Sequence, residues 1–102
     1  MQDFIHAKRE EIADLCRKHH VRRLSVFGSA ARDDFDPDSS DVDVLVTFAS
    51  DADPIYAKNY YSLRDQLEAL FHRDVDLVGD GVIRNPYRIK AINQDKVELY
   101  AA

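Results

Sequence analysis

Three carboxylates and a Gly-Ser turn carry the clearest chemical signal in this chain. Asp41 and Asp43 are separated by one residue, in a segment whose apolar residues alternate as in a strand. Because successive side chains of a strand point to opposite faces, both carboxylates lie on the same face. Like charges a few ångström apart repel by about 1 kcal/mol in water and by ~4 kcal/mol at an effective dielectric of 20. A divalent cation reverses the sign of that interaction, and Mg²⁺ is the usual ion where carboxylates meet phosphate.

A third carboxylate, Asp76, lies in another short alternating segment, residues 75–78. If this segment and residues 42–48 are neighbouring strands with one common buried face, Asp76 shares the opposite face with the first two carboxylates. Three such carboxylates suit two metal ions about 3.5–4 Å apart that clamp the attacking and leaving oxygens of a phosphoryl transfer. We expect Asp41 and Asp43 to hold the ion that grips a nucleotide's phosphates. We expect Asp76 to share the second ion and to accept the proton of an attacking hydroxyl.

The turn that precedes the acidic residues is suited to phosphate binding. Gly28 follows the alternating segment 23–27 and lets the backbone approach a phosphate closely. Unpaired amides at the start of a short helix at 30–32 would face the phosphate oxygens, and the Ser29 hydroxyl adds a donor. Arg32, one turn along, would neutralise part of a triphosphate's charge. The structural alternative for Ser29 is a helix N-cap.

Four strands and three longer helices are expected to position these residues. Hydrophobic periodicity predicts helices at 3–19, 54–71 and 85–93, strands at 23–27, 42–48, 73–78 and 96–100, and an acidic loop at 33–40. The buried face of the second strand is predicted to consist of Val42, Val44, Val46 and Phe48. The apolar stripe of the second helix is predicted to consist of Tyr56, Tyr60, Leu63, Leu67, Leu70 and Phe71.

Length and composition point to one small domain over residues 1–102. The chain is 45% hydrophobic and 32% charged, as ordinary globular proteins are. Its 19 acidic residues outnumber 14 basic ones, which disfavours direct DNA binding because a nucleic-acid binder normally has a basic footprint. No apolar run approaches the ~20 residues of a membrane span, and the N-terminus lacks the pattern of a signal peptide. With a single cysteine, Cys16, which falls on the apolar stripe of the first helix, we expect a cytoplasmic protein without membrane contact.

Two other kinds of metal site are disfavoured by spacing. The acidic loop from Asp34 onward fits positions one, three and five of a calcium EF-hand, but position six is not glycine and position twelve is not glutamate. His6, His19 and His20 lack a cysteine or carboxylate constellation with zinc spacing. We therefore expect these histidines at the surface.

Taken together, the motifs resemble those of the minimal nucleotidyltransferases, small members of the DNA polymerase β-like nucleotidyltransferase superfamily. The resemblance covers nearly the whole chain and rests on segments 27–32 (FGSAAR), 40–46 (SDVDVLV), 75–78 (VDLV), 84–87 (RNPY) and 97–101 (VELYA). It implies an α+β domain with the polymerase β-like palm fold, a small mixed sheet with helices packed on one face.

The resemblance also implies roles for the site residues. It implies that nucleotide phosphates bind at Gly28 and Ser29, that Asp41 and Asp43 bind Mg²⁺, and that Asp76 completes the site. The small stand-alone members commonly act as antitoxins to a helical HEPN ribonuclease toxin encoded beside them, and transfer AMP from ATP to a tyrosine of that toxin. We therefore expect a nucleotidyltransferase that turns ATP and a toxin tyrosine into AMP-tyrosine and diphosphate, with the cognate HEPN toxin as its partner.

Two alternatives to this enzyme remain open. The chain could neutralise a toxin by binding and occlusion without significant catalysis, or it could transfer a nucleotide to a small molecule or an RNA end. Intact carboxylates favour an enzyme, because a scaffold without catalysis would gain stability by losing clustered charge. One departure concerns the loop after the motif arginine, where relatives often have glycine and this chain has Asp33-Asp34.

Overall fold

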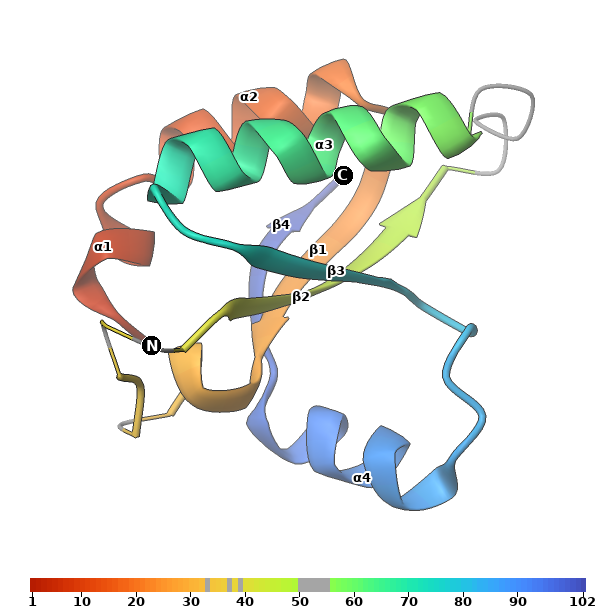
Figure 1. Ribbon diagram of the computed structural model, residues 1–102. Coiled ribbons are helices and arrows are strands. Elements are labelled where there is room, and N and C mark those ends of the chain that lie inside the picture. Colours follow the sequence, from red (N-terminus) through yellow and green to blue (C-terminus); the bar gives the residue numbers. More distant parts are fainter. Residues whose placement is uncertain (33, 37, 39, 50–55) are drawn as a thin grey trace.

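A four-stranded mixed sheet forms the centre of the computed structural model, which describes residues 1–32, 34–36, 38, 40–49 and 56–102 (Figure 1). The strands are β1 (Val21–Phe27), β2 (Val42–Phe48), β3 (Val75–Gly79) and β4 (Val97–Ala101). The helices are α1 (Asp3–His6), α2 (Arg9–Lys18), the 3-10 turn η1 (Gly28–Ala30), α3 (Tyr56–Phe71) and α4 (Pro86–Asp95). The strand order is β3-β2-β1-β4, in which β2 and β3 run parallel and the other two pairs antiparallel. The α+β mixed-sheet fold predicted from the sequence is confirmed.

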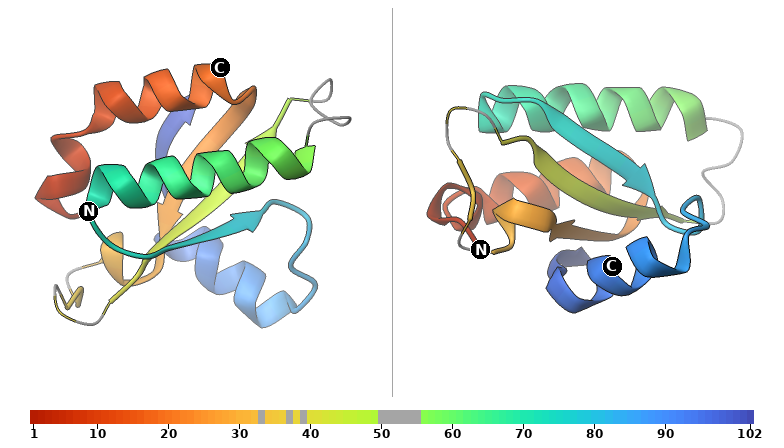
Figure 2. Two further views of the ribbon diagram at one scale, coloured as in Figure 1. Left: turned by 45° about the horizontal axis from the view of Figure 1, so that its top comes forward. Right: turned by 60° about the horizontal axis from the view of Figure 1, so that its bottom comes forward.

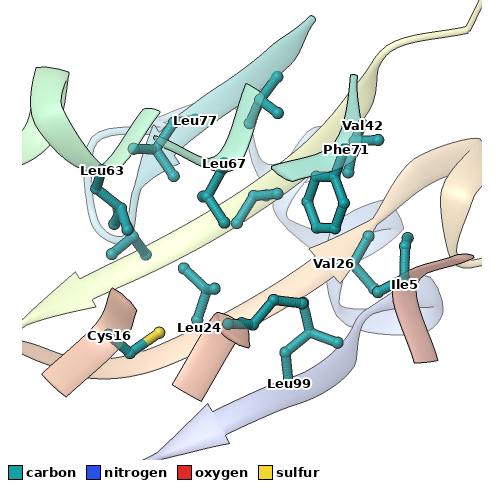
Figure 3. Close-up of a cluster of buried hydrophobic side chains, with 14 of the residues drawn as sticks. Ile5, Cys16, Leu24, Val26, Val42, Leu63, Leu67, Phe71, Leu77 and Leu99 are labelled. Atoms are coloured by element: carbon teal, nitrogen blue, oxygen red, sulfur yellow. The ribbon is translucent and has the colours of Figure 1, made fainter. Parts of the chain in front are cut away.

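Helices α2 and α3 cover one face of the sheet, and α4 lies on the other side (Figure 2). The expectation of helices on one face therefore holds for α2 and α3, while α4 is placed opposite them. Between the sheet and the two covering helices lies the main hydrophobic core (Figure 3). Its labelled members are Ile5, Cys16, Leu24, Val26, Val42, Leu63, Leu67, Phe71, Leu77 and Leu99. Burial raises the pKa of the Cys16 thiol to about 12, which agrees with the expected core position of that residue.

The alternating pattern of β2 is confirmed, although Phe48 at its end is only partly buried against the core. Val42, Val44 and Val46 are buried, and the residues between them are partly exposed. Because this strand is in the middle of the sheet, its register determines which side chains of β1 and β3 share a face with Asp43. The predicted limits of the other strands and helices differ from the observed ones by a few residues, as is usual for the ends of such elements. Asp33, Pro37, Ser39 and the predicted helix start at 54–55 lie outside the described residues.

The single helix expected at 3–19 is divided into α1 and α2. The division falls at Lys8, whose φ of −107° and ψ of 14° are not helical. The backbone amide of Gln2 donates to the Ala30 carbonyl at 3.1 Å, and its side-chain amide donates to the Arg32 carbonyl at 3.0 Å. These bonds tie the start of the chain to the turn after β1. These tertiary hydrogen bonds thus override the helical periodicity of residues 3–19. Helix α1 takes a different direction from α2 (Figure 1).

Helix α4 begins as the sequence predicts. The Asn85 side chain accepts hydrogen bonds from the amides of Tyr87 and Arg88, at 2.9 and 3.4 Å, and Pro86 occupies the first helical position. This cap fixes the start of the helix, and Arg88 lies in its first turn. Within the described part of the chain, no helix combines the length and the apolar character that crossing a membrane requires.

The expected surface position of His19 is wrong. Its side chain is buried between α2 and α3, where Nδ1 lies 2.7 Å from the Leu15 carbonyl and Nε2 lies 2.9 Å from the Ser62 hydroxyl. A buried polar group is tolerated when it is hydrogen-bonded, and that pairing cannot be read from residue spacing alone. His6 and His20 are exposed, as expected.

Candidate active site

Asp43 and Asp76 are direct neighbours across the parallel pair β2 and β3. The valines on either side of Asp43 are buried in the core, so its carboxylate projects from the opposite face of the sheet. Asp76 alternates in the same way with the buried Val75 and Leu77. The parity argument made from the sequence is therefore confirmed, and two carboxylates from different strands lie next to each other.

Asp41 lies one residue before β2 and is exposed. Its charge, like that of Asp76, acts on Asp43. The pKa of the Asp43 carboxyl is raised, first by partial burial and then by the negative charges of Asp76 and Asp41. The three carboxylates of the predicted site thus form one electrostatic group centred on Asp43.

Gly28 brings the backbone of the turn against the Asp43 carboxylate. The two meet because Phe27, the last residue of β1, is the register partner of Asp43. Gly28 has a φ of +67°, and a Cβ atom placed there would collide with Oδ2 of Asp43 and lie 3.3 Å from its Cγ. Only glycine satisfies both the left-handed backbone and the close approach.

Ser29 follows within η1 and is partly exposed beside this contact. The N-cap residue of η1 is Phe27, so Ser29 does not act as the N-cap of this turn. The phosphate role of the Ser29 hydroxyl stays a prediction, and Ser29 directly follows the glycine that lets a ligand approach the backbone.

Arg32 forms ion pairs on two sides. Its Nε and Nη2 atoms each donate to a carboxylate oxygen of Asp34 at 3.1 Å, and Nη1 donates to Oδ2 of Asp95 at 2.6 Å. These bonds raise the pKa of Arg32 and lower that of Asp34. Arg32 therefore joins the acidic loop to the end of α4, and its positive charge lowers the pKa of Asp43. Its predicted contact with a triphosphate would have to compete with these carboxylates.

Arg88 is a residue of the site that sequence reasoning missed. Its positive charge is the first of the two that oppose the raised pKa of Asp43, ahead of Arg32. The Asn85-Pro86 signal placed Arg88 in the first turn of a helix. That signal does not say on which side of the sheet the helix packs. Helix α4 lies on the side opposite α2 and α3 (Figure 2), and this placement brings the charge of Arg88 close enough to act on Asp43.

The donor chemistry of this site fits Mg²⁺. Among the described residues, no three His, Cys, Asp or Glu side chains are gathered closely enough to hold an ion by themselves. Mg²⁺ in nucleotide enzymes rarely needs such a cage, because one or two carboxylates and the substrate's phosphates share its coordination. The neighbouring carboxylates of Asp43 and Asp76 supply hard oxygen ligands, and the glycine beside them leaves room for a phosphate.

Comparisons with known proteins identify the family of this chain. The family model of the nucleotidyltransferase domain matches residues 9–99. Two candidate protein adenylyltransferases of Methanocaldococcus jannaschii are 39% and 33% identical to the chain, each over 95 residues that cover 85% of this chain and 93% of the relative.

Solved structures show the same fold. A candidate minimal nucleotidyltransferase superposes with a TM-score of 0.74 at 28% identity, over 94% of this chain and 95% of the other. The complex of the tri-AMPylated Shewanella oneidensis HEPN toxin with its MNT antitoxin gives a TM-score of 0.65 at 20% identity, over 96% of this chain and 73% of the other. The family suggested by the sequence motifs is confirmed: the chain belongs to the nucleotidyltransferase domain family.

Proposed function

We propose that this protein is a cytoplasmic antitoxin that transfers AMP from ATP, with the help of Mg²⁺, to a tyrosine of a HEPN ribonuclease toxin. The observation that carries the proposal is the pairing of Asp43 with Asp76 directly beside the Gly28 backbone. Support comes from relatives named as candidate protein adenylyltransferases. Further support comes from similar folds solved as a toxin–antitoxin complex with AMP-PNP and as a complex with a tri-AMPylated HEPN toxin.

The acidic face would hold both the ion and the nucleotide. Asp41, Asp43 and Asp76 would be the protein ligands of Mg²⁺, and the triphosphate would lie along the turn at Gly28 and Ser29. When bound, the ion neutralises negative charge on the phosphates and on the departing diphosphate. Arg88, whose charge acts on Asp43, would add a cation on the α4 side.

The chemical step is an in-line displacement at the α-phosphorus of ATP. The tyrosine Oη forms the new bond to phosphorus, and the bond from phosphorus to the oxygen that bridges to the β-phosphate breaks. Diphosphate leaves with that oxygen, and the hydroxyl proton passes to Asp76. Asp76 is exposed on β3, an edge strand, so an incoming side chain can reach it.

Exposed apolar side chains after β3 favour a protein acceptor. Val82, in the stretch that connects β3 to α4, is 66% exposed, and Tyr87, in the first turn of α4, is 84% exposed. Aromatic side chains such as Tyr87 are enriched in protein–protein interfaces. Helix α4 lies on the side of the sheet opposite α2 and α3 (Figure 2), and Asp43 and Asp76 project to that side because their strand neighbours are buried in the core.

Intact-mass spectrometry of the cognate HEPN toxin tests the proposal. The toxin is incubated with this protein, ATP and Mg²⁺, and we expect a mass gain of one or more AMP units on a tyrosine. The Asp41→Asn/Asp43→Asn variant should transfer nothing. The matched control is Asp14→Asn/Asp65→Asn, which also removes two carboxylate charges but does so at exposed positions of helices α2 and α3, which cover the opposite face.

Two results would contradict the proposed enzyme. If the toxin's ribonuclease is inhibited without any mass gain, the protein acts by occlusion. If radiolabelled AMP enters a small molecule or an RNA end while the toxin stays unmodified, the acceptor class is wrong.

A further inference from the structure

A small cavity of about 100 Å³ lies on the acidic side of the sheet, between β2 and α4. It is lined by Leu45, Asp80, Gly81, Ile83, Ile89, Ile92 and Asn93. Pockets that enclose a whole drug-sized ligand measure roughly 300–1,000 Å³. This cavity is therefore suited to one flat ring system that belongs to a larger molecule.

The cavity continues the row of side chains that contains the carboxylates. Leu45 is two residues after Asp43 and shares its face of β2. The next residue of the row, Thr47, donates a hydrogen bond at 3.2 Å to Asp80, which lines the cavity. Ile89 on the α4 wall directly follows Arg88, whose charge acts on Asp43. A ligand with phosphates at the carboxylates would thus extend along β2 into the cavity.

The lining combines apolar walls with two polar groups. Leu45, Ile89 and Ile92 offer the aliphatic surface on which a planar ring packs. Asp80 only accepts hydrogen bonds, whereas the Asn93 amide both donates and accepts. An adenine edge presents an amino donor beside a ring-nitrogen acceptor, and an Asn side chain can pair with both at once. Guanine carries an acceptor oxygen at the same position, which a carboxylate repels.

We infer that this cavity binds the adenine base of ATP. The inference rests on the proposed function: the base is expected in this cavity because the ATP phosphates are proposed to bind at Asp43. Ile89 packs on the ring, Asn93 pairs with its edge, and Asp80 disfavours guanine. Nucleotide choice is then a property of α4 and of the loop after β3, separate from the carboxylates that carry the chemistry.

Calorimetric titration of the full-length protein with two probes, Mg²⁺·ATP and Mg²⁺·tripolyphosphate, tests this inference. Tripolyphosphate has the phosphates and lacks the base. Ile89→Ala should weaken ATP binding by roughly five- to tenfold, because part of the ring contact is lost. It should leave tripolyphosphate binding unchanged. Ile89 is 40% exposed, so its truncation leaves the core intact.

A charge-matched pair of variants on α4 tests the polar edge. Asn93→Asp and Gln94→Glu add the same charge at adjacent exposed positions, and only Asn93 lines the cavity. Asn93→Asp should weaken ATP binding about tenfold more than Gln94→Glu does, because it removes the amide donor. Both variants should weaken tripolyphosphate binding equally. In the wild-type protein, ATP should bind about tenfold more tightly than GTP.

The outcomes separate the cavity from the chemistry. If the wild-type protein binds tripolyphosphate as tightly as ATP, or if Ile89→Ala weakens both alike, the cavity does not hold the base and the proposed transfer is untouched. If the wild-type protein binds neither probe, the proposed function itself fails. NMR gives an independent reading: nuclear Overhauser effects from adenine protons to the Ile83 and Ile89 methyl groups are expected, and their absence at saturating ATP would overturn the inference.

Discussion

Nη1 of Arg32 lies 2.6 Å from Oδ2 of Asp95, so the turn after β1 is bonded to the last residue of α4 across 63 positions of sequence. The same guanidinium is held on its other side by Asp34. Arg32, which is expected to contact a triphosphate, is therefore paired with two carboxylates, those of Asp34 and Asp95. The predicted contact of Arg32 with a triphosphate would require Arg32 to exchange these partners for phosphate oxygens.

This exchange predicts opposite effects for two substitutions. Asp95→Asn removes one competing carboxylate and should tighten Mg²⁺·ATP binding by about two- to threefold, whereas Arg32→Gln should weaken it by a similar or larger factor. The melting temperatures should change little, because the ion pairs are exposed. Calorimetric titration measures both affinities. Unchanged affinities in both variants would remove Arg32 from the nucleotide site.

Asp43→Asn should stabilise the protein alone and abolish its response to nucleotide. The substitution ends the repulsion from Asp76 and Asp41, and it also removes the proposed ligand of Mg²⁺. At a hundredfold excess of Mg²⁺·ATP over its Kd, the wild-type protein should gain about 2.7 kcal/mol of unfolding free energy and the variant none. Thermal melts with and without ligand make the comparison, with Asp14→Asn as the control. A variant that keeps the gain would sink the metal assignment.

The raised pKa of Asp43 predicts a pH dependence of known sign. In the unfolded chain this carboxyl ionises near its usual value of about 3.9, whereas in the folded protein it keeps its proton to higher pH. Between the two pKa values the unfolded state binds fewer protons, so the stability of the ligand-free protein falls as pH rises through that window. The proposed Mg²⁺ affinity rises over the same window, because the ion requires the carboxylate.

The difference in melting temperature between the wild-type protein and Asp43→Asn isolates this effect, since all other carboxyl groups are common to both. The wild-type protein should lose stability relative to the variant as pH rises from the usual carboxyl pKa of about 3.9 through the higher pKa of Asp43 in the folded protein. A constant difference across that range contradicts the raised pKa.

The two described glycines with positive φ allow a matched test of the turn at Gly28. Gly81 has a φ of +86°, and a Cβ there would meet nothing within 4 Å, whereas a Cβ at Gly28 would collide with Asp43. Gly81→Ala should therefore cost only backbone strain, roughly 1–2 kcal/mol. Gly28→Ala should cost more and should displace the carboxylate, with loss of Mg²⁺·ATP binding.

Urea unfolding gives the two free energies, and the double variant Gly28→Ala/Asp43→Ala identifies the contact. Removing the carboxylate should recover the part of the loss that exceeds the cost of Gly81→Ala. If Gly28→Ala and Gly81→Ala are equally destabilising, the close approach of the turn to Asp43 is wrong.

The parts of this molecule that the sequence predicts are those governed by local periodicity. The period of two in residues 42–48 and 75–78 was enough to bring Asp43 and Asp76 to one face, because strand parity leaves no other arrangement once the valines are buried. The Asn85-Pro86 start of α4 is equally local. The roles of these residues in metal and nucleotide binding remain predictions.

What the sequence could not predict depends on tertiary placement. The break at Lys8 follows from bonds between Gln2 and the turn after β1. The burial of His19 depends on the packing of α3, which brings the Ser62 hydroxyl within hydrogen-bond distance of its ring. Arg88 reaches the acidic side only because α4 packs there, and nothing in its own segment selects that side. Each of these depends on partners more than ten residues away in the chain.

The contact between Gly28 and Asp43 also has an evolutionary consequence. A larger residue at position 28 requires both the loss of the carboxylate at position 43 and a left-handed backbone that L-residues rarely adopt. Loss of the aspartate relieves only the collision, so glycine should persist at position 28 longer than aspartate does at position 43. In related chains, a residue other than glycine at position 28 should therefore occur only together with a residue other than aspartate at position 43.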